Sequence, residues 1–162
     1  NPLHLVPNDV QPLPVVLYVD DDAGNRQAFQ AAFRRHFVVR AASGFDEAWA
    51  WLGRGGVDVV ISDQRMPDVT GSELLHLVKE RFPMIKRMLM TGYADVSAVI
   101  DAVNRGGVVR YISKPWDPKE VIDAVDEAFA AVRREREQLA WTEQLVESNR
   151  QLEFALRQRL LS

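Results

Sequence analysis

Cysteine is absent from this 162-residue chain, and its apolar runs are far too short to cross a membrane. Without cysteine there is no disulfide and no cysteine-ligated metal, which is compatible with a reducing cytoplasm. The net charge of −3 is too small to indicate a nucleic-acid partner for these residues. No signal-peptide pattern opens the chain, and the three histidines (His4, His36 and His76) have no partners at metal-ligand spacing. We therefore expect a cytoplasmic protein without membrane contact.

What is present is typical of one folded domain with additional chain. Apolar residues make up 47% and charged residues 27% of the sequence. Residues 1–14 carry four prolines without any periodicity and predict an irregular leader. We expect a folded domain over 15–130 and a helical linker over 131–162. Because the first residue is Asn and the last segment stops in mid-pattern, we interpret the chain as a piece of a longer protein.

Short apolar runs rich in β-branched residues alternate with helical patterns along the chain. The runs predict buried strands over 15–19, 37–42, 57–62, 87–91 and 108–113. Helices are predicted from Asp22, over 45–52, 72–82 and 94–105, and from Asp117 onward, with Asp22 and Ser72 as N-caps. This alternation predicts an α/β fold, with a five-stranded, parallel, doubly wound sheet and a long C-terminal helix.

Chemistry in such sheets lies beyond the carboxyl ends of the strands. There the sequence places Asp20, Asp21, Asp63, Thr91 and Lys114, each directly at or after a predicted strand. Three carboxylates in one pocket repel each other unless a cation lies among them. Oxygen ligands without Cys or His are suited to Mg²⁺, and the lysine and threonine could contact a phosphoryl group. The pattern therefore predicts a Mg²⁺-dependent site for phosphoryl transfer onto a carboxylate.

Four motifs occur in this order, each at the end of a separate predicted strand: YVDDD, DQRMPDVTG, LMTGYAD and YISKPW. Together they resemble the receiver domain of bacterial response regulators, over roughly residues 14–130. The residues of the last three motifs are most similar to those of a receiver subgroup that is fused to hydrogenase-type transcription activators or to HD-GYP phosphodiesterases. The resemblance implies a flavodoxin-like receiver fold, a sensor histidine kinase as partner, and an output domain outside this chain.

The resemblance also implies a role for each matching position. Asp63 would accept the phosphoryl group, and Lys114 would pair first with its carboxylate and then with the phosphoryl group. Asp21 would bind Mg²⁺ directly and Asp20 through water, and the backbone carbonyl of Arg65 would complete the metal site, which also includes Asp63.

Two further positions would respond to phosphorylation. Thr91 would move toward the phosphoryl group, and Tyr111 would turn inward behind it. The Lys114–Pro115 peptide bond is expected to be cis.

Two other functions are alternatives for the same residues, and each has a feature of the sequence against it. A phosphohydrolase with an aspartyl intermediate would usually have a carboxylate two residues after the nucleophile, where this chain has Arg65. An interaction module that is never phosphorylated would have no physical need for all five polar residues.

Arg65 and Tyr93 are large, and we hypothesise that they overhang the phosphoryl group and slow its hydrolysis. Trp49 and Trp51 cannot share a helix face, so we expect one of them to be exposed or partner-facing.

The C-terminal segment contains no glycine after residue 107 and no proline after 118. Two apolar series run along it: one steps by seven from Val125 through Val132, Leu139 and Val146, and the other comprises Leu145, Asn149, Leu152 and Leu156. The second has coiled-coil spacing, and the two series are out of phase, so we expect a shift in the seam. A parallel homodimer is our prediction; a single helix folded back on the domain is the alternative.

Overall fold

The computed structural model describes residues 12–92, 96–104, 107–108 and 110–161. In that part of the chain, strands and helices alternate, and five parallel strands form one sheet in the order β2-β1-β3-β4-β5. Residues 1–11, which make up most of the predicted leader, lie outside the described residues. The predicted fold class is confirmed.

The strands lie within two residues of their predicted positions. They are β1 (Val15–Val19), β2 (Val38–Ala42), β3 (Val59–Asp63), β4 (Lys86–Thr91) and β5 (Arg110–Ser113). The three central strands are almost wholly buried, which explains why they read as continuous apolar runs and not as alternating ones. Asp63 is the last residue of β3 itself and pairs in register with Met90 of β4.

The helices are α1 (Ala23–Phe33), α2 (Phe45–Arg54), α3 (Gly71–Arg81), α4 (Val96–Asn104) and α5 (Pro118–Leu161). Asp22 is the N-cap of α1 and accepts a hydrogen bond from the amide of Asn25, as predicted. The predicted cap of α3 is wrong: Thr70 caps this helix by accepting from the amide of Glu73. Ser72 lies inside the helix and is buried, where its amide donates to the Gln64 side chain.

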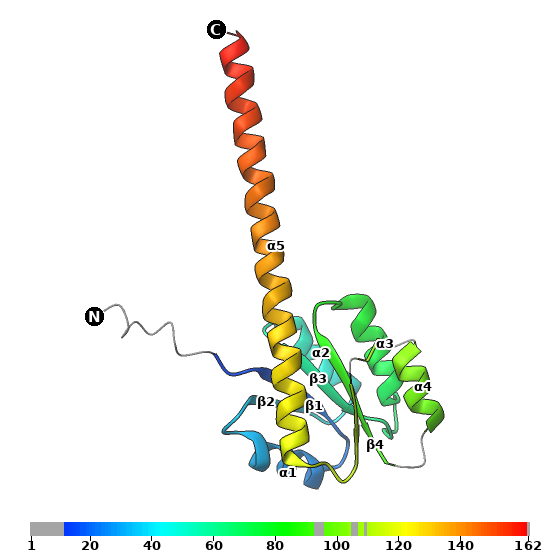
Figure 1. The fold of residues 1–162 in the computed structure, drawn as a ribbon. Helices are drawn as coiled ribbons and strands as arrows, with labels where there is room; N and C mark the ends of the chain where they lie inside the picture. Colours follow the sequence, from blue (N-terminus) through cyan, green and yellow to red (C-terminus); the bar gives the residue numbers. More distant parts are fainter. Residues whose placement is uncertain (1–11, 93–95, 105–106, 109, 162) are drawn as a thin grey trace, which may run out of the picture.

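Helices cover both faces of the sheet (Figure 1), and an apolar layer lies under the helices on each face. On one face, α1 and α5 cover side chains of the four strands β1, β3, β4 and β5, through Phe29, Phe33, Val121 and Val125 among others. On the other face, α2, α3 and α4 contribute Leu52, Leu74, Val78 and Ala102. The sheet is therefore covered on both faces, as a parallel sheet requires.

Trp49 and Trp51 are both half-buried, so neither is exposed, and the alternative that one of them faces a partner stays a prediction. Trp49 packs between Phe45 and Phe82, with ring centroids at 5.1 and 5.4 Å. Trp51 points toward the edge strand β2, where its indole N–H donates to the Ala41 carbonyl oxygen at 3.2 Å. The guanidinium groups of Arg40 and Arg54 also lie 5.1 and 4.8 Å from its ring centroid, so Trp51 finds its partners at the sheet edge.

Helix α5 has two parts with different surroundings. Its first part packs on the sheet as far as Val132, whereas the longer second part extends away from the domain (Figure 1). Where the helix leaves the sheet, Glu135 pairs with Lys86 at 2.6 Å and Arg136 pairs with the buried Asp58 at 2.9 Å. These two ion pairs attach α5 to the amino-terminal ends of β3 and β4. No described helix has the length and apolarity that a membrane span requires.

Candidate phosphoacceptor site

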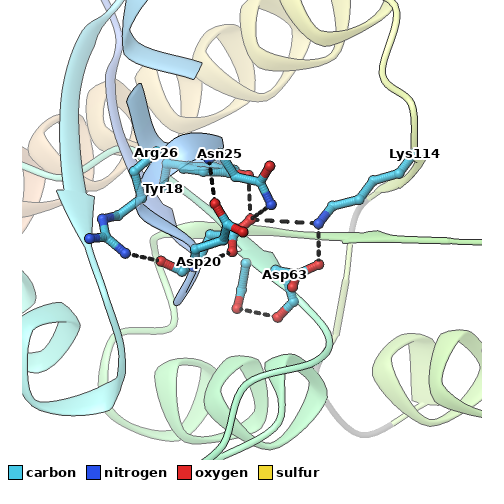
Figure 2. A network of polar contacts seen from close by, with 8 residues as sticks. Tyr18, Asp20, Asn25, Arg26, Asp63 and Lys114 are labelled. Atoms are coloured by element: carbon cyan, nitrogen blue, oxygen red, sulfur yellow. Dashed lines mark hydrogen bonds and ion pairs between the residues drawn. The ribbon is translucent and has the colours of Figure 1, made fainter. Parts of the chain in front are cut away.

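The candidate site lies at the carboxyl edge of the sheet, where the four adjacent strands β1, β3, β4 and β5 end. Asp20 and Asp21 follow β1, Asp63 closes β3, and Lys114 follows β5. The parallel register brings these ends to one edge, although the residues are far apart in the sequence. Figure 2 shows Lys114 reaching across this edge toward both Asp20 and Asp63.

Asp63 is held in place through its backbone and paired through its side chain. Its Oδ1 lies 2.7 Å from Lys114 Nζ, and its carbonyl oxygen accepts from the Ser62 hydroxyl at 2.9 Å. The residue is 8% exposed, so its carboxylate is mostly removed from water. Behind it, Gly71 at the start of α3 lies so close that a Cβ there would be 2.2 Å from the Asp63 carbonyl oxygen. The motif glycine therefore permits close approach of two backbone segments.

Asp20 is fully buried and surrounded by hydrogen-bond donors. Its Oδ2 accepts from the Tyr18 hydroxyl at 2.8 Å and from Asn25 Nδ2 at 3.1 Å, and it lies 3.5 Å from Lys114 Nζ. Its Oδ1 accepts from the Asp22 amide at 3.0 Å. A buried carboxylate needs such partners, because an isolated ionised carboxylate is very costly to bury.

Within the described residues, Asp20, Asp21 and Asp63 form a group whose ligand oxygens all lie within 4.8 Å of one another. Asp21 is exposed, whereas the other two are buried. Oxygen donors alone, at a rim with one solvent-facing member, match the preference of Mg²⁺ for carboxylates and retained waters. The residues therefore fit this ion, as their sequence pattern predicts.

The charges in the site are unbalanced toward the negative. Burial raises the pKa of Asp63, with a further increase from Asp20, and together these outweigh the ion pair with Lys114. For Lys114, burial lowers the pKa, but the carboxylates of Asp63 and Asp20 outweigh it and leave the pKa raised. Both directions follow from two buried carboxylates facing one ammonium group, and a divalent cation would remove this excess.

Other predicted site residues lie at the same edge. Thr91 is the buried last residue of β4, and its carbonyl oxygen accepts from the Lys114 amide at 2.9 Å. Tyr111 on β5 is half-buried, and its hydroxyl donates to the same carbonyl oxygen at 3.4 Å. The Lys114–Pro115 bond is cis, as predicted. Arg65 is exposed in the loop after β3, and Tyr93 lies outside the described residues.

The structure adds two residues that the sequence reasoning missed, Tyr18 and Asn25. The Tyr18 ring stacks on Phe29 with centroids 4.1 Å apart, and burial, reinforced by Asp20, raises the pKa of its phenol. The hydroxyl is therefore protonated at neutral pH and donates to Asp20. A signal was available in the sequence: a tyrosine inside the apolar strand VVLYV needs a partner for its hydroxyl.

Comparison with known proteins agrees with this geometry. Residues 16–126 match the family model of the response regulator receiver domain. The chain is 43% identical over 116 residues to the hydrogenase transcriptional regulatory protein HoxA of Cupriavidus necator, covering 72% of this chain and 24% of that protein. It is 31% identical over 123 residues to the DNA-binding transcriptional regulator NtrC of Proteus hauseri, covering 75% of this chain and 26% of that protein. The chain thus spans about a quarter of the length of these relatives.

Solved structures give the same result. The signal receiver domain of an HD domain-containing protein from Pseudomonas fluorescens Pf-5 aligns with a TM-score of 0.74 and 31% identity, covering 78% of this chain and 94% of that one. A CheY-like receiver domain protein from Methanospirillum hungatei aligns with a TM-score of 0.70 and 26% identity, covering 76% and 98%. Sequence, fold and relatives agree that the chain belongs to the response regulator receiver domain family and is related to regulators of the HoxA and NtrC type.

Proposed function

We propose that Asp63 is the phosphoacceptor of this receiver domain and that a phosphohistidine of a sensor histidine kinase is its donor. The observation that carries the proposal is the ion pair between Asp63 and Lys114, with the buried carboxylate of Asp20 and the exposed carboxylate of Asp21 beside it. An Asp63 carboxylate oxygen attacks phosphorus, the phosphorus–nitrogen bond breaks, and the imidazole leaves. Lys114 neutralises charge on the acceptor before the transfer and on the phosphoryl oxygens after it.

Asp20, Asp21, Asp63 and the Arg65 backbone carbonyl would hold Mg²⁺. When bound, this ion supplies charge neutralisation for the carboxylates and the phosphoryl oxygens. Thr91 and Tyr111 would respond to the phosphoryl group as a switch, and the hydrogen bond from the Tyr111 hydroxyl to the Thr91 carbonyl oxygen supports a coupled movement. The domain's chemistry would be limited to its own phosphorylation and slow dephosphorylation, in the cytoplasm.

Acetyl phosphate with Mg²⁺ tests the assignment. Intact-mass spectrometry should find one added phosphoryl group on the wild-type chain, and fragment masses should locate it on Asp63. Asp63→Asn should gain none, whereas Asp68→Asn, an exposed acid in the loop that follows, should react as the wild type does. Phosphorylation of the Asp63→Asn chain to the wild-type extent would refute the proposal.

The metal is tested by its effect on unfolding. At a Mg²⁺ concentration 100-fold above the dissociation constant, bound ion should stabilise the fold by roughly 2.7 kcal/mol. Asp21→Asn should lose most of this gain, because its exposed carboxylate is available as a direct ligand. Equal stabilisation of the wild type and Asp21→Asn would contradict the ligand set.

We also propose that the part of α5 beyond Val132 joins two copies of the chain. From Leu139 to Leu161, nine large apolar side chains are at least 50% exposed on this helix. A 44-residue helix is about 66 Å long, and the part beyond Val132 has no core of its own to cover. A second copy would cover this surface in a coiled coil, and the proposed dimer would carry the signal to an output domain outside these residues. Light scattering that finds only monomer at concentrations of roughly 10–100 µM would refute the dimer.

A further inference from the structure

The hydrogen bonds of Asp20 limit which of its two carboxylate oxygens can bind a cation. An ionised carboxylate has about four lone-pair positions, two on each oxygen. Here Oδ2 faces three donors, on Tyr18, Asn25 and Lys114, whereas Oδ1 accepts a hydrogen bond from the Asp22 amide alone within the described part of the chain. The capacity that remains for a cation or its water therefore lies on Oδ1.

This asymmetry bears on which cation the site accepts. Mg²⁺ requires near-octahedral geometry with short bonds, and takes one oxygen or a bound water from each carboxylate. Ca²⁺ has longer bonds and six to eight ligands, and it commonly binds both oxygens of one carboxylate. A carboxylate with one oxygen saturated by hydrogen bonds cannot provide the second mode without losing those bonds.

Resting on the function proposed above, we propose that Tyr18 and Asn25 are positioning residues that make the site selective for Mg²⁺ over Ca²⁺ by preventing bidentate coordination through Asp20.

The two residues are well placed for this role, as Figure 2 shows for both side chains at Asp20. Tyr18 is fully buried on β1, and its ring is fixed by the parallel stack on Phe29 at an interplanar angle of 4°. Asn25 lies on the first turns of α1, whose start is fixed by the Asp22 cap. The two donors therefore reach one oxygen from a rigid strand and from a capped helix.

Their removal is tested one donor at a time. Tyr18→Phe deletes the hydroxyl and keeps the ring, and Asn25→Ala deletes the amide at an exposed position. Gln27→Ala is the matched control, because Gln27 is an exposed polar residue on the same helix. Mg²⁺ and Ca²⁺ are titrated separately into each chain, with fluorescence of the tryptophans and isothermal calorimetry as readouts. Trp116 lies in the cavity that Tyr18 and Lys114 also line and reports on this site.

We expect the ratio of the Ca²⁺ to the Mg²⁺ dissociation constant to fall about tenfold in each variant, which corresponds to about 1.4 kcal/mol, the scale of one hydrogen bond to a charged group. The double variant should fall further, and Gln27→Ala should keep the wild-type ratio. A loss of general stability would weaken both ions alike and leave this ratio unchanged.

An unchanged ratio in both Tyr18→Phe and Asn25→Ala, with Mg²⁺ binding intact, would overturn the positioning role and leave the proposed function in place. Failure of the wild-type chain to bind Mg²⁺ at all would overturn the proposed function together with this inference.

Discussion

Gly71 provides a sharp test of how the acceptor is positioned. It is the first residue of α3, and a Cβ at this position would lie 2.2 Å from the Asp63 carbonyl oxygen, 2.9 Å from the Asp63 carbonyl carbon and 2.9 Å from Leu89 Cδ1. Ordinary contacts begin at about 3.4 Å, so backbone must move by more than an ångström to admit a methyl group. Neither β3 nor α3 can move easily, because β3 is buried between β1 and β4 and α3 is packed on the sheet.

Gly71→Ala should therefore destabilise the fold despite the better helix propensity of alanine. Overpacking costs roughly 1–3 kcal/mol, and the propensity gain at the first residue of a helix is well below the ~1 kcal/mol of a helix interior. We expect a loss of about 2 kcal/mol, which shifts the urea midpoint down by about 1 M for a slope near 2 kcal/mol/M. Phosphorylation by acetyl phosphate should slow as well, because the displaced atoms belong to Asp63.

Gly53→Ala is the matched control for this change. Gly53 is an exposed residue of α2, and nothing lies within 4 Å of a Cβ built on it. Alanine there should stabilise the fold by up to ~1 kcal/mol. The two substitutions are chemically identical and should have opposite signs. If Gly71→Ala unfolds at the wild-type urea concentration or above, the close approach does not constrain the acceptor and the reasoning fails.

Three further outcomes are expected. Arg65→Ala should shorten the lifetime of the phosphorylated chain if the hypothesis of a hindered attacking water holds, and unchanged dephosphorylation would remove that hypothesis. Glu47 accepts from the Ser43 hydroxyl at 2.6 Å and from the Ser43 amide at 3.2 Å, and these bonds lower its pKa below the ordinary 4.5. The stabilisation of the fold by these bonds is therefore present above that pH and is lost as pH falls through the lowered pKa. Carboxyl NMR titration should find the pKa of Glu47 closer to 4.5 in Ser43→Ala. Reversing the charge of either Lys86 or Glu135 should cost roughly 0.5–1 kcal/mol in urea unfolding, and reversing both should restore most of it.

The strands and helices could be predicted because their signals are local or periodic. Continuous apolar runs mark strands buried on two faces, and a breaker such as Pro83 marks the end of the helix before it. The error at Ser72 has a specific cause: Thr70 and Ser72 are both good caps, and the choice between them depends on the buried Gln64 side chain that binds Ser72. Such a partner is not visible in a local pattern.

Some residues of the candidate site could be predicted from the sequence and others could not, for the same reason. Asp20, Asp63 and Lys114 could be brought together from sequence because the rule for parallel sheets places strand ends at one edge. Tyr18 and Asn25 could not, because both hydrogen bonds depend on side-chain directions within β1 and α1. The exposure expected for Trp49 or Trp51 was wrong for a related reason: Trp51 reaches the edge strand β2, so exposure does not follow from helix faces alone.

The two apolar series of α5 differ in direction, which leads to a last prediction about the proposed dimer. At 3.6 residues per turn, the series of Leu145, Leu152 and Leu156 points roughly 120° round the helix from the side chains buried on the sheet. A second helix on this series would therefore avoid the line along which α5 packs on its own domain. Phe154 points roughly opposite to it by the same count, although it is equally exposed, at 64% against 60% for Leu152.

Disulfide cross-linking separates these directions in a chain that has no cysteine of its own. Leu152→Cys should give a covalent dimer under mild oxidation, because seam positions of a parallel coiled coil face their counterparts. Phe154→Cys is the matched control: it lies two residues away on the same exposed helix and should remain uncoupled at equal concentration. Efficient cross-linking at 154 with none at 152 would place the seam on the opposite face, and cross-linking at neither position would favour a helix that meets no second copy.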